Sequence, residues 1–164
     1  MIQCMVISTP TTNYTANDYL QLFTDIGYPQ GYTQFIESRI DWPAPNVPTY
    51  CFYGLGVPTL EKLVYDDGFP DAQPISLING DGDGTVNKAS LEICLRWANS
   101  GYLFNNTVFP GVSHIGLISN KAVFESIAEI VGAPRDPINN HGIAHIATVQ
   151  LLGAVILFSQ FLGF

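Results

Sequence analysis

The sequence predicts an α/β domain in which parallel strands alternate with flanking helices. Of its 164 residues, 47% are hydrophobic and 12% are charged, which fits one domain with a buried core. From residue 49 to residue 131, short apolar segments bounded by Pro or Gly alternate with segments of helical periodicity. The resulting order, strand then helix, repeated, is typical of a parallel sheet.

The amino-terminal segment, residues 1–48, is expected to contain one helix. Thr15 and Asp18 form a capping-box pattern at its start, because the Thr hydroxyl can accept from first-turn amides while Asp18 reaches back. Apolar residues then recur at helical spacing until Gly27 ends the helix. Residues 28–48 are rich in Pro, so the sequence favours an extended connection or a lid segment there.

Four later segments are rich in aromatic, β-branched or other apolar residues and are expected to be strands, at residues 49–54, 63–65, 74–78 and 103–109. Two segments have apolar residues at helical spacing. The first runs from Lys88 to Asn99. The second begins at a cap provided by Ser119 and ends at Gly132. Residues 49–135 are therefore expected to form the α/β core.

The carboxyl-terminal segment, residues 136–164, differs in kind. From Gly142 to Phe164 it is almost wholly apolar and contains no Lys, Arg, Asp or Glu. A helix of about 20 such residues crosses a bilayer. A transmembrane or tail anchor is one interpretation, a lipid-anchor signal is less favoured because its polar spacer would be short, and a non-native end such as translated intron sequence is a third. His141 and His145 have helical metal-pair spacing, but no further ligand accompanies them.

Charge and cysteine content limit the partners and the compartment. The net charge is −8 with only six Lys and Arg in total, so the sequence argues against nucleic-acid binding. The three cysteines, Cys4, Cys51 and Cys94, permit one disulfide and one leftover thiol. Acceptor tripeptides for N-glycosylation begin at Asn13 and Asn105 and indicate passage through the secretory pathway. The amino terminus has no signal-peptide pattern, so secretion would require further sequence upstream.

The segment from Asn79 to Asn87 carries two carboxylates among three glycines, between an expected strand and an expected helix. Its Asp83, and His114 further on, each follow an expected strand, and adjacent parallel strands bring such loops together. A carboxylate bonded to one imidazole nitrogen fixes the tautomer and leaves the other nitrogen free as a general base. The order therefore resembles the last two members of a Ser-Asp-His triad. The alternative is a loop histidine without a catalytic role.

A calcium loop is the competing interpretation of the acidic segment. Asp81, Asp83 and Glu92 fall at the first, third and twelfth positions of a helix-loop-helix calcium site. Val86 occupies the sixth position, where such a site requires glycine, and a strand is expected to precede the loop. We therefore expect no metal and no cofactor.

Four motifs together resemble the lecithin-cholesterol acyltransferase family, closest to its lysosomal (group XV) phospholipase A2 branch. They are Asp-Tyr-x-x-x-Phe-x-Asp-Ile-Gly at 18–27, Cys-x-Tyr-Gly-x-Gly-Val-Pro-Thr at 51–59, Gly-Asp-Gly-Asp-Gly-Thr-Val-Asn at 80–87 and Pro-Gly-x-x-His at 110–114. The resemblance covers about residues 10 to 132. It implies the carboxyl-terminal part of an α/β-hydrolase fold that acts on glycerophospholipid esters at a membrane or lipoprotein surface.

The same resemblance implies roles for particular residues. Asp83 would be the catalytic Asp, His114 the catalytic His, and Cys51 would be disulfide-bonded to Cys94, which leaves Cys4 alone. Residues 1–48 would be a remnant of the family's lid or cap region. The implied location is the secretory pathway, either lysosomal or extracellular.

One departure from the family pattern concerns the nucleophile. The elbow Gly-x-Ser-x-Gly is absent from the sequence, and the nearest similar segment, residues 111–115, lacks the second glycine. We therefore expect a fragment of a phospholipase or O-acyltransferase that is inactive alone. The alternative is a non-enzymatic, membrane-anchored protein in which the remaining hydrolase fold binds lipid or a partner.

Overall fold

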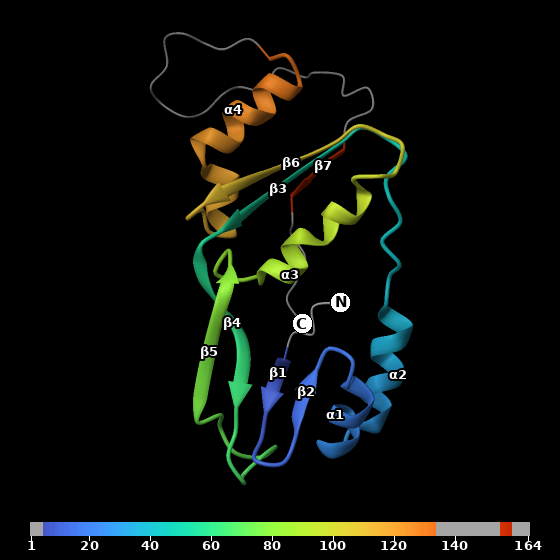
Figure 1. Cartoon of the computed structure of the whole chain (residues 1–164), viewed down its shortest axis with the longest axis vertical. Coiled ribbons are helices and arrows are strands. Elements are labelled where there is room, and N and C mark those ends of the chain that lie inside the picture. The colour runs from blue at the N-terminus through green and yellow to red at the C-terminus, as the bar shows by residue number, and fades with distance from the viewer. Residues whose placement is uncertain (1–4, 134–154, 159–164) are drawn as a thin grey trace.

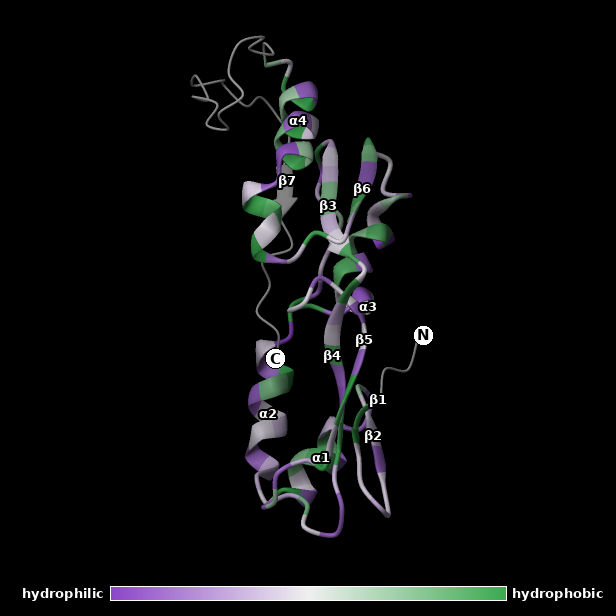
Figure 2. Cartoon of the chain, turned by 90° about the vertical axis from the view of Figure 1, so that its left-hand side faces the viewer, coloured by the Kyte–Doolittle hydropathy of each residue, from purple (hydrophilic) through white to green (hydrophobic). Residues whose placement is uncertain are grey.

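The computed structural model describes residues 5–133 and 155–158, which form two sheets with helices beside them (Figure 1). The first, a mixed sheet, has the order β2-β1-β4-β5, with β1 (Met5–Ser8), β2 (Asn13–Thr15), β4 (Val57–Val64) and β5 (Ser76–Gly82). The second, a parallel sheet, has the order β6-β3-β7, with β3 (Thr49–Leu55), β6 (Phe104–Pro110) and β7 (Val155–Phe158). The molecule is elongated, with one sheet toward each end (Figures 1 and 2).

Strand β3 is the centre of the parallel sheet and confirms the predicted α/β class. Residues 49–55 pair in parallel with residues 104–110, and residues 49–52 pair in parallel with residues 155–158. β3 is largely buried because both faces of the sheet are covered. Cys51 and Tyr53 pack on one face, against α3 (Lys88–Leu91) and the 3₁₀ helix η1 (Glu92–Trp97). Phe52 packs on the other, against the 3₁₀ helix η2 (Ile115–Ser119) and α4 (Lys121–Ile130).

A hairpin interrupts the expected alternation of strands and helices. Strand β4 runs antiparallel to β5, and Val57 at its start pairs with Gly82 at the end of β5. The expected strands at 63–65 and 74–78 were therefore too short, and part of the acidic segment is strand. Much of the hairpin is exposed to solvent, so it lacks the continuous apolar run of a buried strand. Because Ile7 pairs with Leu63, the mixed sheet joins strands from both sides of residue 48.

The amino-terminal segment contains two helices, α1 (Tyr19–Asp25) and α2 (Pro29–Ser38). The expectation of an irregular segment from residue 28 was wrong for α2. Pro29 occupies the first turn of α2, where a missing amide costs no helical hydrogen bond. The rings of Tyr19 in α1 and Phe35 in α2 pack with their centroids 4.5 Å apart, so tertiary contact stabilises α2. Figure 2 shows α2 beside the mixed sheet.

The start of α1 also differs from the prediction. Asp18 does reach back, because its Oδ2 accepts from the Thr15 amide at 2.8 Å and from the Thr15 hydroxyl at 2.6 Å. These bonds hold the turn before the helix, and the helix itself begins only at Tyr19. Gly27, with φ of +75°, follows its end as predicted.

The two carboxyl-side helices differ from the sequence prediction at their ends. The helix expected over residues 88–99 is one α-helical turn, α3, continued by η1. The cap of α4 is Asn120, whose side chain accepts from the amides of Ala122 and Val123 at 2.9 and 3.3 Å. The predicted cap, Ser119, instead donates to the Gly116 carbonyl within η2, at 3.3 Å. Ser119 therefore belongs to the preceding turn rather than to α4.

Most of the apolar segment for which a membrane anchor is one interpretation lies outside the described residues, as do His141, His145 and Cys4. Its described part, residues 155–158, is the strand β7. Within residues 5–133 and 155–158, no helix has both the length and the apolar character needed to cross a bilayer.

Candidate active site

The hairpin of β4 and β5 places Asp83 at the end of β3. The chain leaves β3 at Leu55, and Asp83 returns to form a parallel bridge with Val57. β6 lies beside β3 in parallel, and the loop that follows β6 carries His114. The two loops meet beyond the carboxyl ends of β3 and β6, as expected. The route differs from the expectation, because Asp83 follows a strand of the mixed sheet.

Asp83 is fully buried and every oxygen of its carboxylate is bonded. Oδ2 lies 2.9 Å from Nδ1 of His114. Oδ1 accepts from the backbone amides of Thr85 and Val86 at 3.0 and 2.7 Å. The Asp83 carbonyl accepts from the His114 amide at 2.8 Å, so main chain and side chain both hold the two residues together. The two amides donate to Oδ1, and Nδ1 of His114 is placed to donate to Oδ2.

The contact leaves one ring nitrogen of His114 able to take up a proton. An ionised carboxylate only accepts hydrogen bonds, so Nδ1 carries the hydrogen that faces Asp83. In the neutral ring, Nε2 then has a free lone pair, and no described residue bonds to it. The His114 side chain is 14% exposed, so the ring is packed but reachable. This arrangement supports general-base chemistry at Nε2.

A close approach between backbones fixes the loop that carries His114. A side-chain carbon added at Gly54 in β3 would lie 1.9 Å from the Val112 carbonyl oxygen. Only glycine leaves room for that carbonyl. The Gly111 amide also donates to the Leu55 carbonyl at 2.7 Å, so the loop is bonded to the end of β3.

Asp81, the first acid of the segment, has a different environment. Its Oδ1 accepts from the Gly56 amide at 2.8 Å, and its Oδ2 lies 3.9 Å from Nζ of Lys88. Lys88 is also 3.9 Å from Glu92, the third residue of the calcium pattern. Within the part of the chain that the structure describes, no three His, Cys, Asp or Glu side chains are grouped as a metal site requires. Through its bond to the Gly56 amide, Asp81 joins the base of the hairpin to the residue that follows β3.

Sequence reasoning missed Thr59, although this residue closes the motif at 51–59. Thr59 is buried, and its Oγ1 accepts from the Gly84 amide at 2.8 Å, directly beside Asp83. The signal was the threonine at the end of Gly-Val-Pro-Thr, a polar residue in an otherwise apolar strand start. Sequence alone does not show which amide such a hydroxyl meets.

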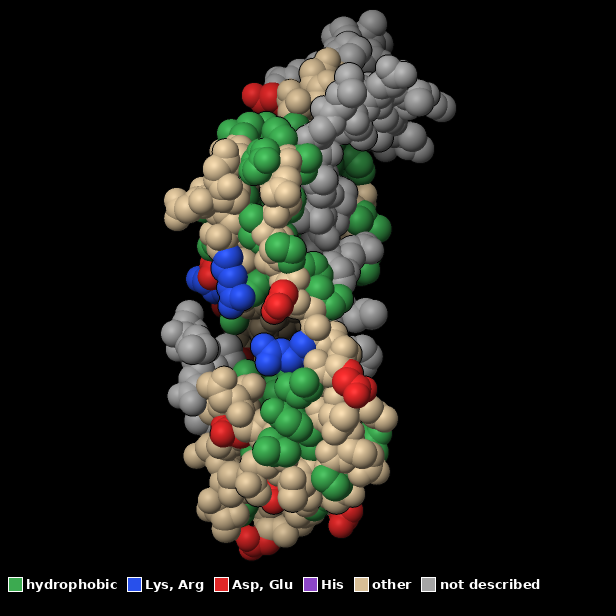
Figure 3. Space-filling view, turned by 90° about the vertical axis from the view of Figure 1, so that its right-hand side faces the viewer, with side chains coloured by type: hydrophobic (Ala, Val, Ile, Leu, Met, Phe, Trp, Pro, Cys, Tyr) green, Lys and Arg blue, Asp and Glu red, His purple; other side chains and the backbone are tan. Residues whose placement is uncertain are grey.

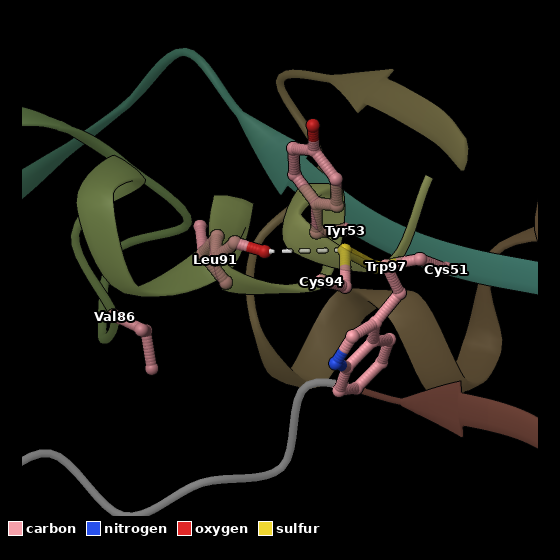
Figure 4. Packing of buried hydrophobic residues seen from close by; sticks show 6 residues of the cluster. All are labelled: Cys51, Tyr53, Val86, Leu91, Cys94 and Trp97. Carbon is pink, nitrogen blue, oxygen red and sulfur yellow. Dashed lines mark hydrogen bonds between the residues drawn. A yellow bond between two sulfur atoms is a disulfide. The ribbon is translucent and has the colours of Figure 1, made fainter. Parts of the chain in front are cut away.

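Cys51 and Cys94 form a disulfide that joins β3 to η1, across 43 positions of sequence. The two cysteines belong to a buried cluster that includes Tyr53, Leu91 and Trp97 (Figure 4). Burial of the Tyr53 ring, with the negative charge of Glu92 nearby, raises the pKa of its phenol. The disulfide and the cluster fix the helical segment that follows the Asp83 turn.

The surface shows where the remaining predicted residues lie. Asn13 in β2 and Asn105 in β6 are both exposed, and Asn13 accepts from the Ser8 hydroxyl at 2.7 Å. On the face in Figure 3, the coloured basic side chains form small groups with acidic side chains nearby, not a continuous stripe.

Comparison with known proteins gives a family match over a segment that contains Asp83 and His114. The model of a family described as lecithin:cholesterol acyltransferase matches residues 9–121. A phosphatidylcholine-sterol acyltransferase of Gallus gallus is 47% identical over 96 residues, which is 57% of this chain and 23% of that protein. The Rattus norvegicus protein of the same name is 35% identical over 150 residues, 88% of this chain and 33% of that protein.

The Homo sapiens protein of that name is 35% identical over 134 residues, which is 79% of this chain. The match covers 30% of the human protein. This chain thus spans about a third or less of the length of the three relatives.

Proposed function

This chain belongs to the lecithin:cholesterol acyltransferase family, and from that premise we propose that His114 is the general base of a lipid acyl-transfer site and that Asp83 is the carboxylate that orients it. The observation that carries the proposal is the 2.9 Å contact between Asp83 Oδ2 and His114 Nδ1, formed by a carboxylate with no exposure to solvent. A buried carboxylate orients the imidazole and stabilises its protonated form. The substrate class is a glycerophospholipid ester.

In the proposed reaction, Nε2 of His114 takes the proton from a serine hydroxyl as the serine oxygen bonds to the ester carbonyl carbon. The carbon–oxygen bond to the glycerol then breaks, and His114 gives its proton to the departing lysophospholipid oxygen. In the second half, His114 removes a proton from water or a lipid alcohol, whose oxygen attacks the acyl-enzyme. The serine recovers the proton as the new ester or fatty acid leaves. Asp83 stays ionised throughout.

The serine of this proposal is not among these 164 residues, because no Gly-x-Ser-x-Gly elbow occurs in their sequence. The relatives are about three or more times as long as the segment that this chain matches in them. We therefore propose that this chain supplies the Asp and the His of the triad and part of the parallel sheet, and has little or no acyl-transfer activity alone.

A chimera tests the function directly. Residues 9–121 of this chain would replace the matching segment of the Gallus gallus relative, and release of lysophosphatidylcholine from phosphatidylcholine vesicles would be measured. We expect the chimera to be active and this chain alone to be inactive. A chimera that folds, by circular dichroism and a cooperative melt, yet is inactive beside an active parent would overturn the proposal.

The acyl acceptor is a separate question. The relatives compared are named for a sterol acceptor, whereas the four sequence motifs together are interpreted as closest to the phospholipase A2 branch. We propose water as an acceptor beside a lipid alcohol. The same chimera, assayed with and without cholesterol in the vesicles, decides this. Free fatty acid release that falls to background when cholesterol is present would exclude water as a competing acceptor.

We further propose a secretory location. The disulfide between Cys51 and Cys94 suits an oxidising compartment, and the two acceptor asparagines, Asn13 and Asn105, are exposed. Expression behind a secretion signal, followed by glycosidase treatment, should shift the electrophoretic mobility. Asn13→Gln and Asn105→Gln should each remove one step of that shift.

The apolar segment from Gly142 to Phe164 keeps a second function open, that of a membrane-anchored protein that binds lipid without catalysis. Carbonate extraction of membranes from cells that express the full chain separates the two. Retention in the carbonate-resistant pellet, together with an inactive chimera, would favour the anchored protein.

A further inference from the structure

The turn that carries Asp83 is held from one side by a single buried hydroxyl. Thr59 in β4 is 1% exposed, and its Oγ1 accepts from the Gly84 amide at 2.8 Å. The same hydroxyl donates to the Val57 carbonyl at 2.9 Å. Both hydrogen-bonding capacities of the side chain are therefore used, one toward its own strand and one toward the turn.

Gly84 depends on this contact because of its conformation. Its φ is +89°, a left-handed conformation that glycine adopts readily, so the chain turns here instead of continuing as a strand. A side-chain carbon at this position would lie 3.1 Å from Cγ1 of Val57. Gly84 itself is exposed, so without Thr59 water would replace the lost acceptor and the turn would lose its bond to β4. The turn would then relax at the residue adjacent to Asp83.

Several hydrogen bonds hold the turn, and they act on different atoms. The amides of Thr85 and Val86 hold Oδ1 of Asp83, and the His114 amide holds the Asp83 carbonyl. Thr59 holds the backbone just after Asp83. A shift of the turn would change the distance from Oδ2 to Nδ1 of His114 before it disturbed either sheet.

We propose that Thr59 is a positioning residue that sets the contact between Asp83 and His114. This inference rests on the proposed function for its catalytic consequence, although the contact itself is a property of the chain. Thr59 touches no reacting atom. It acts through the Gly84 amide on the orientation of the Asp83 carboxylate.

The chain contains a matched control in Thr49. This threonine is also buried in a strand, at 2% exposure, and its hydroxyl also donates to the carbonyl two residues earlier, Val47, at 3.0 Å. No hydrogen bond from its hydroxyl to the Asp83 turn is present among the described residues. Thr49→Val and Thr59→Val thus remove the same atom from similar surroundings, and only one of them removes the turn contact.

The activity experiment uses the chimera described above. Thr59→Val should lower kcat about tenfold to a hundredfold with little change in KM, because a small misplacement of a catalytic group affects chemistry more than binding. Thr59→Ser should restore most of kcat, since it keeps the hydroxyl. Thr49→Val should retain kcat. Equal losses in the two valine variants, or no rescue by serine, would overturn the positioning role.

A spectroscopic experiment on the full chain separates this inference from the proposed function. In the native chain, the His114 Nδ1 proton should give a low-field NMR signal and the Gly84 amide should exchange slowly with solvent. Thr59→Val should weaken both, whereas Thr49→Val should leave both unchanged. If the parent chimera is inactive but these signals respond in this way, the proposed function fails and the positioning inference stands. Signals that are identical in all three proteins would overturn it.

Discussion

Two contacts in this molecule join a carboxylate to an ionisable ring, yet they differ in what remains available. Asp83 meets His114 at 2.9 Å at the edge of the parallel sheet. Asp25 in α1 meets the Tyr14 hydroxyl of β2 at 2.6 Å, at the mixed-sheet end. The imidazole keeps a second nitrogen after the contact forms, whereas the phenol has used its only proton. A contact between a carboxylate and a ring can therefore support general-base catalysis only when the ring keeps a second atom that can bind a proton.

Removing each carboxylate charge gives the largest expected contrast. In the chimera, Asp83→Asn should lower kcat by about 10⁴, because the amide holds the wrong tautomer of His114. Asp25→Asn should leave kcat close to that of the parent, since among the described residues the Asp25 carboxylate bonds to the Tyr14 hydroxyl and the Gln21 side chain, both far from the candidate site in sequence. Initial rates of lysophosphatidylcholine release measure both. Comparable rates for Asp83→Asn and the parent would remove Asp83 from the mechanism.

Removing the disulfide should destabilise the parallel-sheet end of the molecule more than the mixed-sheet end. Replacing Cys51 and Cys94 together by Ala should lower the free energy of unfolding by about 2–4 kcal/mol, because the unfolded chain gains freedom. Urea unfolding of the full chain measures this change. Amide hydrogen exchange should show the greater loss of protection in β3, and the smaller loss in β1 and β2. Equal loss in the two regions would indicate that they unfold as one unit.

Gly54→Ala tests the backbone approach beneath the His114 loop. The added methyl group would overlap the Val112 carbonyl, and the repacking should cost about 1–3 kcal/mol. It should also lower kcat in the chimera, because His114 moves with the loop. Gly101→Ala is the control for backbone strain, since its φ is +86° but no atom lies within 4 Å. If the two variants have equal kcat, the close approach at Gly54 has no role in placing His114.

Alkaline pH should lower the folding stability of the chain through Tyr14, at the mixed-sheet end. Burial, reinforced by the hydrogen bond to Asp25, raises the pKa of Tyr14 to about 12. An unfolded tyrosine titrates near pH 10, so the folded chain holds this proton more tightly. The resulting stabilisation is complete below about pH 10 and is lost as the pH rises toward 12. Urea midpoints between these pH values should fall less steeply for Tyr14→Phe, and identical slopes would contradict the assignment.

The elements that sequence predicted best are those whose burial leaves a plain pattern. β3 and β6 were predicted close to their observed bounds because both sit within the parallel sheet. The β4–β5 hairpin was only partly predicted because its exposed positions break the apolar run. α2 was missed because Pro29 and Gly31 suggested a breaker, while the ring contact that stabilises α2 comes from another helix.

The candidate site was predictable in its residue types and less so in its geometry. Asp83 and His114 stood out because each follows a strand in the order that a triad requires. That Asp83 arrives through a hairpin depends on pairing between distant residues, which a sequence pattern does not encode. The role of Thr59 depends on the Gly84 amide, 25 positions away. A hydroxyl has no preferred partner until the tertiary turn forms.

The paired base of the hairpin has a consequence for how this family can vary. Because Val57 and Gly82 lie side by side, the chain between them can lengthen or shorten in matched pairs of residues without moving Asp83. Insertions at the outer end, near residues 65–75, would extend the mixed sheet away from the parallel one. The outer surface of the hairpin can therefore change while the distance between Asp83 and His114 stays the same.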